Sequence, residues 1–347
     1  MTATMPADSR RRLLPLIAVL ALPAAAVAQL EEVVPVSGFL SSEETPAFST
    51  DISSTVPLHA TNAMLLRPGE WRLLVTAGHQ EYIGAADGDS SSGTGEILGQ
   101  GFTFAPRKMS VETATLQGLV GLDEDNTLSA ALPWVKSRMR QAMAGGDFTT
   151  EAAGLGDVNL GLTHRSWQGE SGRLLLYGGL SLPTGSVNEK DDVPGAPDQT
   201  LDYIQQPGSG TVDLRPALTW LYDKKEWVYG AQLAIVQRLG RNTEGWSASN
   251  QQELSVWAAQ RLDDESSITG RVTAMYWGDV HGSADDLDPS VSPTQDPSRQ
   301  SGKRVDIALG YRDHGFVMEA GVPVFQSLDG PQLELNWYFT AGWQFAF

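Results

Sequence analysis

The side chains best suited to covalent chemistry in this sequence are His164 and Ser166, which stand two positions apart. On a β-strand such residues share one face, so the imidazole could take the hydroxyl proton and turn the serine into a nucleophile. A working site also needs a polar group that orients the ring, and we find no Asn on an adjacent outward face for that role. We therefore favour structural polar roles for both residues over catalysis.

Metal and thiol chemistry has little support in the composition. The chain has no Cys, which excludes disulfides and thiolate ligands, and its 5 His are scattered. No two of them have the spacing of metal ligands: His59, His79, His164, His281 and His314. We expect no metal site and no cofactor.

The last segment indicates which elements carry these residues. Apolar side chains occupy every odd position from 333 to 347, and mostly polar ones lie between them. This period of two gives one long strand an apolar face and a polar face. Such length and so many aromatic residues on one face are typical of a strand that crosses a membrane at a tilt. The terminal Phe347 also matches the signal by which bacterial barrel proteins are recognised for insertion, so it is the candidate assembly signal.

The other end of the sequence indicates export. Three arginines at 10–12, an apolar stretch at 13–27 and a small-residue cleavage site at 26–28 are typical of a secretory signal peptide. Residues 1–28 are therefore predicted as a signal peptide, 29–66 as an extended or partly disordered extension, and 67–347 as a β-barrel. No other window is apolar enough for a spanning helix, and the mean hydropathy is −0.21. The outer membrane of a Gram-negative bacterium is the predicted location, with a soluble all-β protein as the alternative.

Alternation along the rest of the chain predicts an all-β, antiparallel transmembrane barrel of about twelve strands. Connections from even to odd strands are short and most of those from odd to even strands are long, which places both termini in the periplasm. The strands are expected at 71–82, 109–122, 127–138, 155–167, 173–183, 211–222, 227–239, 253–262, 267–277, 304–311, 316–325 and 332–347.

Charged side chains of both signs fall on the polar faces of these strands. The candidate lumen-lining residues are Arg72, Asp157, Asp213, Arg215, Arg271, Asp306, Glu319 and Glu334. In one interpretation they pair across neighbouring strands and fill a narrow barrel, since an unpaired buried charge is costly. In the other, the three last acids form an acidic wall facing the arginines at 215 and 271, which would orient a small polar solute. We favour pairing for each residue, and still expect a narrow water-filled path.

The net charge of −18 argues against nucleic acid as a partner. The expected partners are outer-membrane lipid and lipopolysaccharide, the barrel assembly machinery and a small-molecule solute. Acidic clusters at Asp191, Asp192, Asp285, Asp286 and Asp288 fall in long loops and are interpreted as solvated charges. The alternative is that they collect divalent cations that bridge to lipopolysaccharide phosphates.

Four stretches of the chain resemble one known family. They are GLGDVNL at 154–160, LSLPTGS at 180–186, GSGTVDL at 208–214, and PQLE at 331–334 with AGWQ at 341–344. They are similar to the bacterial outer-membrane transporter-like family named for the putative meta-pathway of phenol degradation. The resemblance implies a porin-like barrel that passes small, aromatic or hydrophobic compounds, whereas the polar lumen favours polar solutes. A non-conducting structural or surface protein is the main alternative, and a membrane-embedded lipase is a weaker one.

That resemblance does not extend to metal handling. Members of the family that are suspected of handling metals are rich in Met and His, whereas this chain has 8 Met and 5 His. We therefore expect a solute channel without bound metal.

Overall fold

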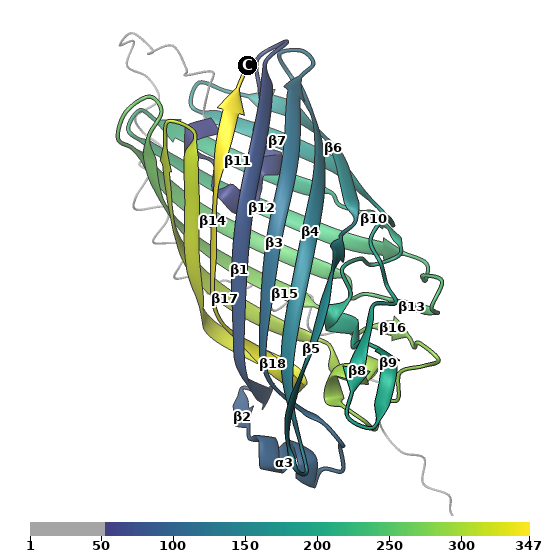
Figure 1. Cartoon of the computed structure of the whole chain (residues 1–347). Coiled ribbons are helices and arrows are strands. Elements are labelled where there is room, and N and C mark those ends of the chain that lie inside the picture. Colours follow the sequence, from purple (N-terminus) through teal and green to yellow (C-terminus); the bar gives the residue numbers. More distant parts are fainter. Residues whose placement is uncertain (1–52) are drawn as a thin grey trace, which may run out of the picture. The chain divides into compact units, whose positions relative to one another are not determined.

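The structure is a closed antiparallel β-barrel (Figure 1), taken from a computed structural model that describes residues 53–347. The predicted signal peptide and the first part of the predicted extension, residues 29–52, lie outside the described residues. Of the 14 strands in the main sheet, 11 close the barrel and β2 (Ser90–Ser92), β5 (Gly146–Leu155) and β10 (Val212–Leu214) extend it at one end. Within residues 53–347, no helix has the length and apolar character needed to cross a membrane.

The closing strands run around the wall nearly in chain order, each hydrogen-bonded to the next. They are β1 (Trp71–Gly88), β3 (Ala105–Gly121), β4 (Asn126–Met143), β6 (Val158–Gln168), β7 (Gly172–Leu182), β11 (Ala217–Lys224), β12 (Trp227–Leu239), β14 (Gln251–Arg261), β15 (Ser267–Trp277), β17 (Gly302–Asp313) and β18 (Phe316–Ala346). β18 then pairs with β1 and closes the barrel.

The longest strand, β18, crosses the wall twice. Its first part pairs with β17 and its second part with β1. The two parts also lie against each other, because the Gln344 amide donates to the Gly315 carbonyl at 2.7 Å. Gln326 bonds the backbone of Leu335 in both directions, at 2.9 and 3.0 Å. Eleven elements therefore make twelve crossings, as the alternation predicts.

Apolar side chains cover the outside of the barrel, which explains why the alternation is legible in the sequence. Trp71 is 57% exposed and Leu309 is 70% exposed. Aromatic residues meet at the short-turn end, where Trp220 stacks on Tyr222 with ring centroids 5.8 Å apart. These features are those of a transmembrane barrel, since lipid covers an apolar band between aromatic girdles. The predicted fold class is confirmed.

Two predicted strands are each interrupted. The strand expected at 155–167 is divided between β5 and β6, and the one expected at 211–222 between β10 and β11. Pro216 stands in the second gap, where its missing amide hydrogen removes one ladder bond. Each pair of short strands still occupies one place in the wall, because β5 and β6 both pair with β4.

The connection expected as a long loop at 139–154 is instead a strand extension. β4 continues to Met143 and pairs with β5 across a tight turn. Cross-strand ion pairs hold this ribbon, including Lys136 to Glu151 at 2.7 Å and Arg140 to Asp147 at 2.7 Å. Outside lipid neither face must be apolar, so the ribbon lacks the alternation by which strands are recognised.

A register shift changes the direction of side chains in the final strand. The pairing of β1 with β18 is irregular between Glu81 and Ala85. As a result Leu333 and Leu335 are buried inside, whereas Trp337 and Phe339 are exposed outside. The prediction of one continuous apolar face from 333 to 347 is therefore wrong below the irregularity, because an extra residue in a strand reverses the alternation.

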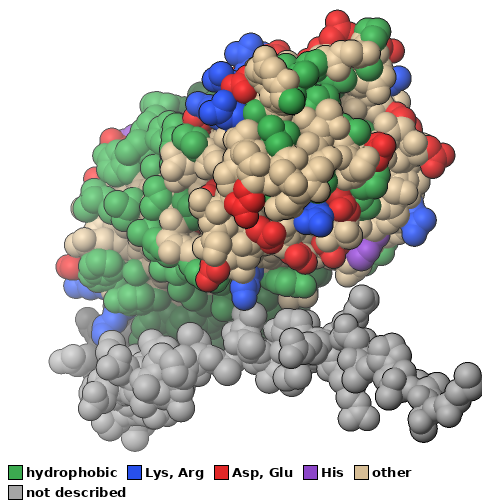
Figure 2. All heavy atoms as spheres, turned by 90° about the horizontal axis from the view of Figure 1, so that it is seen from below, with side chains coloured by type: hydrophobic (Ala, Val, Ile, Leu, Met, Phe, Trp, Pro, Cys, Tyr) green, Lys and Arg blue, Asp and Glu red, His purple; other side chains and the backbone are tan. Residues whose placement is uncertain are grey.

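The connections at the long-loop end pack against one another. β8 (Lys190–Val193) pairs with β9 (Ala196–Thr200), and β13 (Trp246–Ser247) pairs with β16 (His281–Gly282). The ring centroids of Tyr203 and Trp246 lie 5.0 Å apart in an edge contact. Figure 2 views this end and shows Asp and Glu side chains spread over the loops, while hydrophobic side chains gather on the flank of the barrel.

Short helical turns complete the described chain. They are η2 (Ser53–Thr55), η3 (Leu58–Ala63), α3 (Thr94–Gly99), η4 (Tyr203–Gln205), η5 (Pro293–Gln295) and η6 (Pro297–Arg299). The chain ends at the short-turn end, where the backbone of Phe347 exchanges two hydrogen bonds with Trp71, at 2.9 and 3.2 Å. The Phe347 side chain is 77% exposed.

Candidate lumen site

The segment before the first strand lies inside the barrel. η2 contacts β14, β15 and β17, whereas η3 contacts β6, β7 and β18. The segment therefore reaches walls on different sides of the lumen, and its purple turns are seen within the barrel in Figure 1. The sequence predicts an extended or partly disordered segment here, whereas the described part, from Ser53, forms the short helical turns η2 and η3. We name residues 54–66 the inner segment.

Hydrogen bonds tie the inner segment to strands around the barrel. Thr163 of β6 donates to the carbonyl of Asn62 at 2.8 Å, and Gln232 of β12 donates to the Asn62 side chain at 3.0 Å. The amide of Leu66 donates to Thr127 of β4 at 2.8 Å. Because these bonds come from three strands, the inner segment is held as part of the barrel interior.

An apolar cluster anchors the same segment at the short-turn end. Its members are Val56, Ala60, Ala63, Met64, Leu66, Leu119, Leu175, Leu221 and Trp257. The first three follow helical spacing, i, i+4 and i+7, and His59, Thr61 and Asn62 stand between them. That pattern is the sequence signal by which the inner segment could have been recognised.

Two cavities lie between the inner segment and the barrel wall. The first, of about 350 Å³, is lined by His59, Thr61, Asn62, Thr115, Gln117, Ser129, Ala131, Asn159, Tyr177, Arg215, Gln232, Ala234, Val236, Gln251, Glu253 and Met275. We name it the amide cavity, because Asn and Gln side chains from five elements face it. Only three of its lining residues can carry charge near neutral pH: His59, Arg215 and Glu253.

The second cavity, of about 300 Å³, contains the paired charges, and we name it the ion-pair cavity. Arg271 contacts Glu319 with an N–O separation of 2.5 Å and also donates to the Tyr338 hydroxyl at 3.2 Å. Arg304 contacts Asp306 at 2.9 Å. The charges of these two arginines and two acids therefore sum to zero. The two cavities share His59, Thr61, Thr115, Gln117 and Met275 as a common boundary.

The boundary residue His59 bonds a strand carboxylate. Its Nε2 lies 3.0 Å from Oε2 of Glu253 on β14. The charge of Glu253 is the main cause that raises the pKa of His59, and burial opposes it. Half of the His59 side chain, 49%, remains exposed to the lumen, so water screens the pair. The ion pair nevertheless links the inner segment to the wall.

This pair predicts a pH dependence of ion selectivity. A raised pKa means that His59 is charged below about 6.5 and loses its proton only as the pH rises through the higher folded value. The net charge of the amide cavity then falls from +1 to zero. The charge of +1 is the sum of the two cations Arg215 and His59 and the anion Glu253. At low salt, anion preference in a KCl gradient should decline above about pH 6.5 in wild type and be flat in His59→Gln. Parallel profiles for the two proteins would contradict this role of the imidazole.

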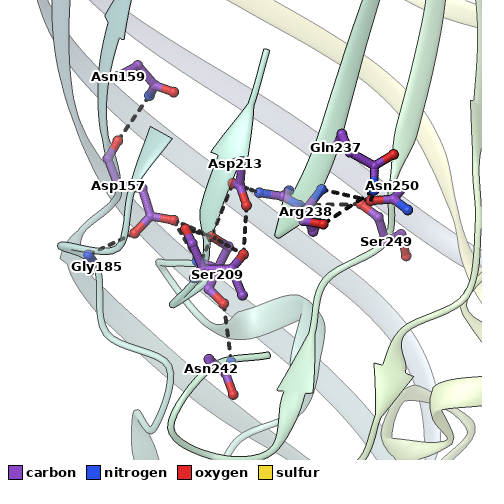
Figure 3. A network of polar contacts seen from close by, with 11 residues as sticks. Asp157, Asn159, Gly185, Ser209, Asp213, Gln237, Arg238, Asn242, Ser249 and Asn250 are labelled. Atoms are coloured by element: carbon purple, nitrogen blue, oxygen red, sulfur yellow. Dashed lines mark hydrogen bonds and ion pairs between the residues drawn. The ribbon is translucent and has the colours of Figure 1, made fainter. Parts of the chain in front are cut away.

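Two of the predicted lumen residues instead hold a buried network near the long-loop end (Figure 3). The Asp157 carboxylate accepts hydrogen bonds from the amides of Gly185 and Ser209 at 2.9 and 2.7 Å. Asp213 is fully buried and pairs with Arg238. Neither acid lines a described cavity. Both therefore stabilise the ends of strands and loops rather than a solute path.

The network explains three of the four family-like stretches. Asp157, Gly185 and Ser209 come from the stretches at 154–160, 180–186 and 208–214, so these three meet in space. Their backbones are in close contact, because a Cβ built on Gly185 would lie 2.7 Å from the Cα of Gly208. Glycine is required there for the approach itself.

The other candidate residues have separate positions. Arg72 is buried and donates to Glu70 at 2.6 Å, away from both cavities. Glu334 lines neither cavity, because the register shift in β18 turns Leu335 toward the lumen in its place. The acidic wall of the second interpretation does not form, because Glu319 pairs with Arg271 and Arg215 lies in the other cavity. Arg304 and the inner segment were missed.

The pair His164 and Ser166 also differs from expectation. Asn126 does orient the ring, with its Oδ1 3.0 Å from Nδ1 of His164, a contact missed because the two residues are far apart in sequence. Ser166, however, donates to the carbonyl of Leu174 at 3.2 Å. A register irregularity between Arg165 and Trp167 removes the simple alternation at this serine. In the described contacts the His164 ring bonds the Asn126 side chain, and the Ser166 hydroxyl bonds a backbone carbonyl instead of the ring.

The closed sheet and its apolar outer surface place the chain in the class of transmembrane β-barrels. The chain belongs to the family described as "Putative MetA-pathway of phenol degradation", whose model matches residues 83–312, more than half of the sequence. The resemblance inferred from the sequence motifs is confirmed. No curated protein matches the chain.

Several solved structures are similar to this chain to different degrees. The COG4313 outer membrane channel from Pseudomonas putida F1 is similar with a TM-score of 0.57 and 12% identity, over 81% of this chain and 97% of that chain. The NanC porin gives a TM-score of 0.40 and 8% identity, over 78% and 98% of the two chains. The beta domain of the Bordetella autotransporter BrkA has a TM-score of 0.41 and 11% identity, over 80% of this chain and 100% of that chain.

Proposed function

We propose that this barrel is an outer-membrane channel that passes small solutes passively. The observation that carries the proposal is the pair of polar cavities between the inner segment and the wall, with volumes of about 350 and 300 Å³. A lumen filled only for stability would have no reason to keep so many amide and hydroxyl groups facing open space. The similar channel from Pseudomonas putida F1 shares the fold, and supports the proposal to that extent.

The size of the cavities favours solutes of one ring or less. An apolar cavity of about 150 Å³ holds benzene, so either space admits a small aromatic compound together with some water. The family description, which refers to phenol degradation, supports aromatic compounds as cargo. The polar lining favours those that carry hydrogen-bonding groups.

Planar bilayers test the channel directly. Purified barrel should produce stepwise currents in KCl, and addition of phenol or benzoate to one side should reduce them by occupying the lumen. A barrel shown to be folded by heat-dependent electrophoretic mobility that gives no current would contradict the proposal and favour a structural protein.

We also propose that the short turns face the periplasm and the long loops face outward, in contact with lipopolysaccharide. The orientation predicts which insertions are accessible. An epitope at Gly195, an exposed turn between β8 and β9, should bind antibody on intact cells. One at Lys224, the last residue of β11 before the turn to β12, should bind only after the outer membrane is opened. Antibody binding at Lys224 in intact cells would reverse the orientation.

Phe347 fits the further proposal that the barrel assembly machinery recognises the last strand. Its backbone closes the barrel against Trp71, but its side chain is exposed and makes little contribution to packing. A large loss of folded barrel on removing this one residue would therefore reflect recognition rather than stability.

A further inference from the structure

The charges of the lumen leave one cation over. In the ion-pair cavity, Arg271 contacts Glu319 and Arg304 contacts Asp306. In the amide cavity, the carboxylate of Glu253 contacts His59. Arg215, which lines the same cavity, has no carboxylate within ion-pair distance among the described residues. It is thus the cation of the two cavities that the protein itself leaves without an anion.

The nearest acid along the chain does not pair with Arg215 either. Asp213 stands two positions earlier, but its oxygens accept hydrogen bonds from Thr211 at 2.6 Å and Ser209 at 3.2 Å. The same carboxylate pairs with Arg238. Asp213 is fully buried and pairs with Arg238, and the described contacts include no ion pair between it and Arg215. The nearest acid along the chain is therefore paired with another arginine.

The remaining lining of the amide cavity suits a polar guest. Gln117, Gln232 and Gln251 line it. Asn159 contributes a buried Oδ1 that has no hydrogen-bond partner, although its Nδ2 donates to the Asp157 carbonyl at 3.0 Å. A buried polar atom without a partner is costly unless a ligand or water completes it. Unused hydrogen-bonding capacity and an unneutralised cation therefore occur in one space.

We propose that Arg215 binds the carboxylate of a small monocarboxylic acid in the amide cavity, which makes such anions the substrate class of the channel. A guanidinium offers a planar fork of donors that matches a carboxylate. A net charge of +1, from Arg215 and protonated His59 against Glu253, favours one anion and disfavours a cation. The volume of about 350 Å³ accommodates a single-ring acid. This inference rests on the proposed channel function for its biological meaning, but the binding itself does not require conduction.

Equilibrium binding of benzoate to the full-length barrel, folded in detergent, tests the site. Benzamide, which has nearly the same shape and no charge, is the matched probe. Wild type should bind benzoate and bind benzamide at least about tenfold more weakly. Arg215→Gln should weaken benzoate by at least about tenfold and leave benzamide unchanged. Arg138→Gln removes an exposed arginine of β4 that lines neither cavity, and is the control for overall charge.

The outcomes separate the two proposals. Equal benzoate affinity in wild type and Arg215→Gln, or no benzoate binding by wild type, would overturn the assignment even if the barrel conducts. Arginine-dependent benzoate binding by a barrel that gives no current in bilayers would support the site and contradict the channel. The variant Arg215→Lys distinguishes loss of the charge from loss of the fold. It keeps the positive charge and should retain more benzoate affinity than Arg215→Gln. Lysine and glutamine variants that bind equally weakly would also contradict a charge-dependent site.

Discussion

Replacing Arg238 by Met should lower the free energy of unfolding of the barrel by about 3–5 kcal/mol. The substitution removes the cation that pairs with Asp213 and leaves that carboxylate fully buried. An unpaired buried charge costs more than the original pair contributes, because desolvation is no longer offset. Thr211 and Ser209 still donate to the acid, which limits the loss but does not neutralise it.

Urea unfolding of the refolded barrel, followed by tryptophan fluorescence, measures this effect. The double variant Arg238→Met with Asp213→Asn should recover much of the loss, because the buried charge is then absent. Arg138→Met, at a side chain that is 65% exposed, should change stability by less than about 1 kcal/mol. A double variant no more stable than Arg238→Met alone would show that packing, and not charge, is responsible.

The sequence predicts the barrel well because lipid imposes one rule on every strand. A side chain facing hydrocarbon must be apolar, so residues such as Trp71 and Leu309 mark their strands without knowledge of any partner. The same rule fails where lipid ends. Both faces of the ribbon of β4 and β5 are polar. Ion pairs such as Arg140 to Asp147 give the sequence no alternation by which the ribbon could be recognised.

The lumen could be predicted only in part, since inward positions can be inferred from parity but their partners cannot. Arg271 and Glu319 both line the ion-pair cavity, but whether they face each other across the lumen or form a pair depends on the register of three strands. Glu334 was misplaced by one irregularity in pairing, which the apolar alternation of β18 does not reveal. The inner segment was missed because it has no period of two, and the helical spacing of Val56, Ala60 and Ala63 covers only about two turns.

Of the changes considered, removal of most of the inner segment should alter the conductance of the barrel most. A mature chain that begins at Met64 lacks His59, Thr61 and Asn62, which separate or line the two cavities. The two spaces should then merge, and single-channel conductance in KCl should rise by a factor of at least about two, since current scales with open cross-section. The change also removes buried Val56 and Ala60, so some loss of stability is expected.

A chain that begins at Ser53 is the matched control, because it keeps the inner segment and lacks only what precedes it. It should conduct like wild type, so that the difference between the two truncations belongs to residues 53–63. Equal conductance of both truncated barrels would mean that the inner segment does not limit the path. An increase already present in the chain from Ser53 would assign the restriction to earlier residues. The expected result, a wider pore only when the bonds of Asn62 to Thr163 and Gln232 are lost, identifies the inner segment as the constriction of the lumen.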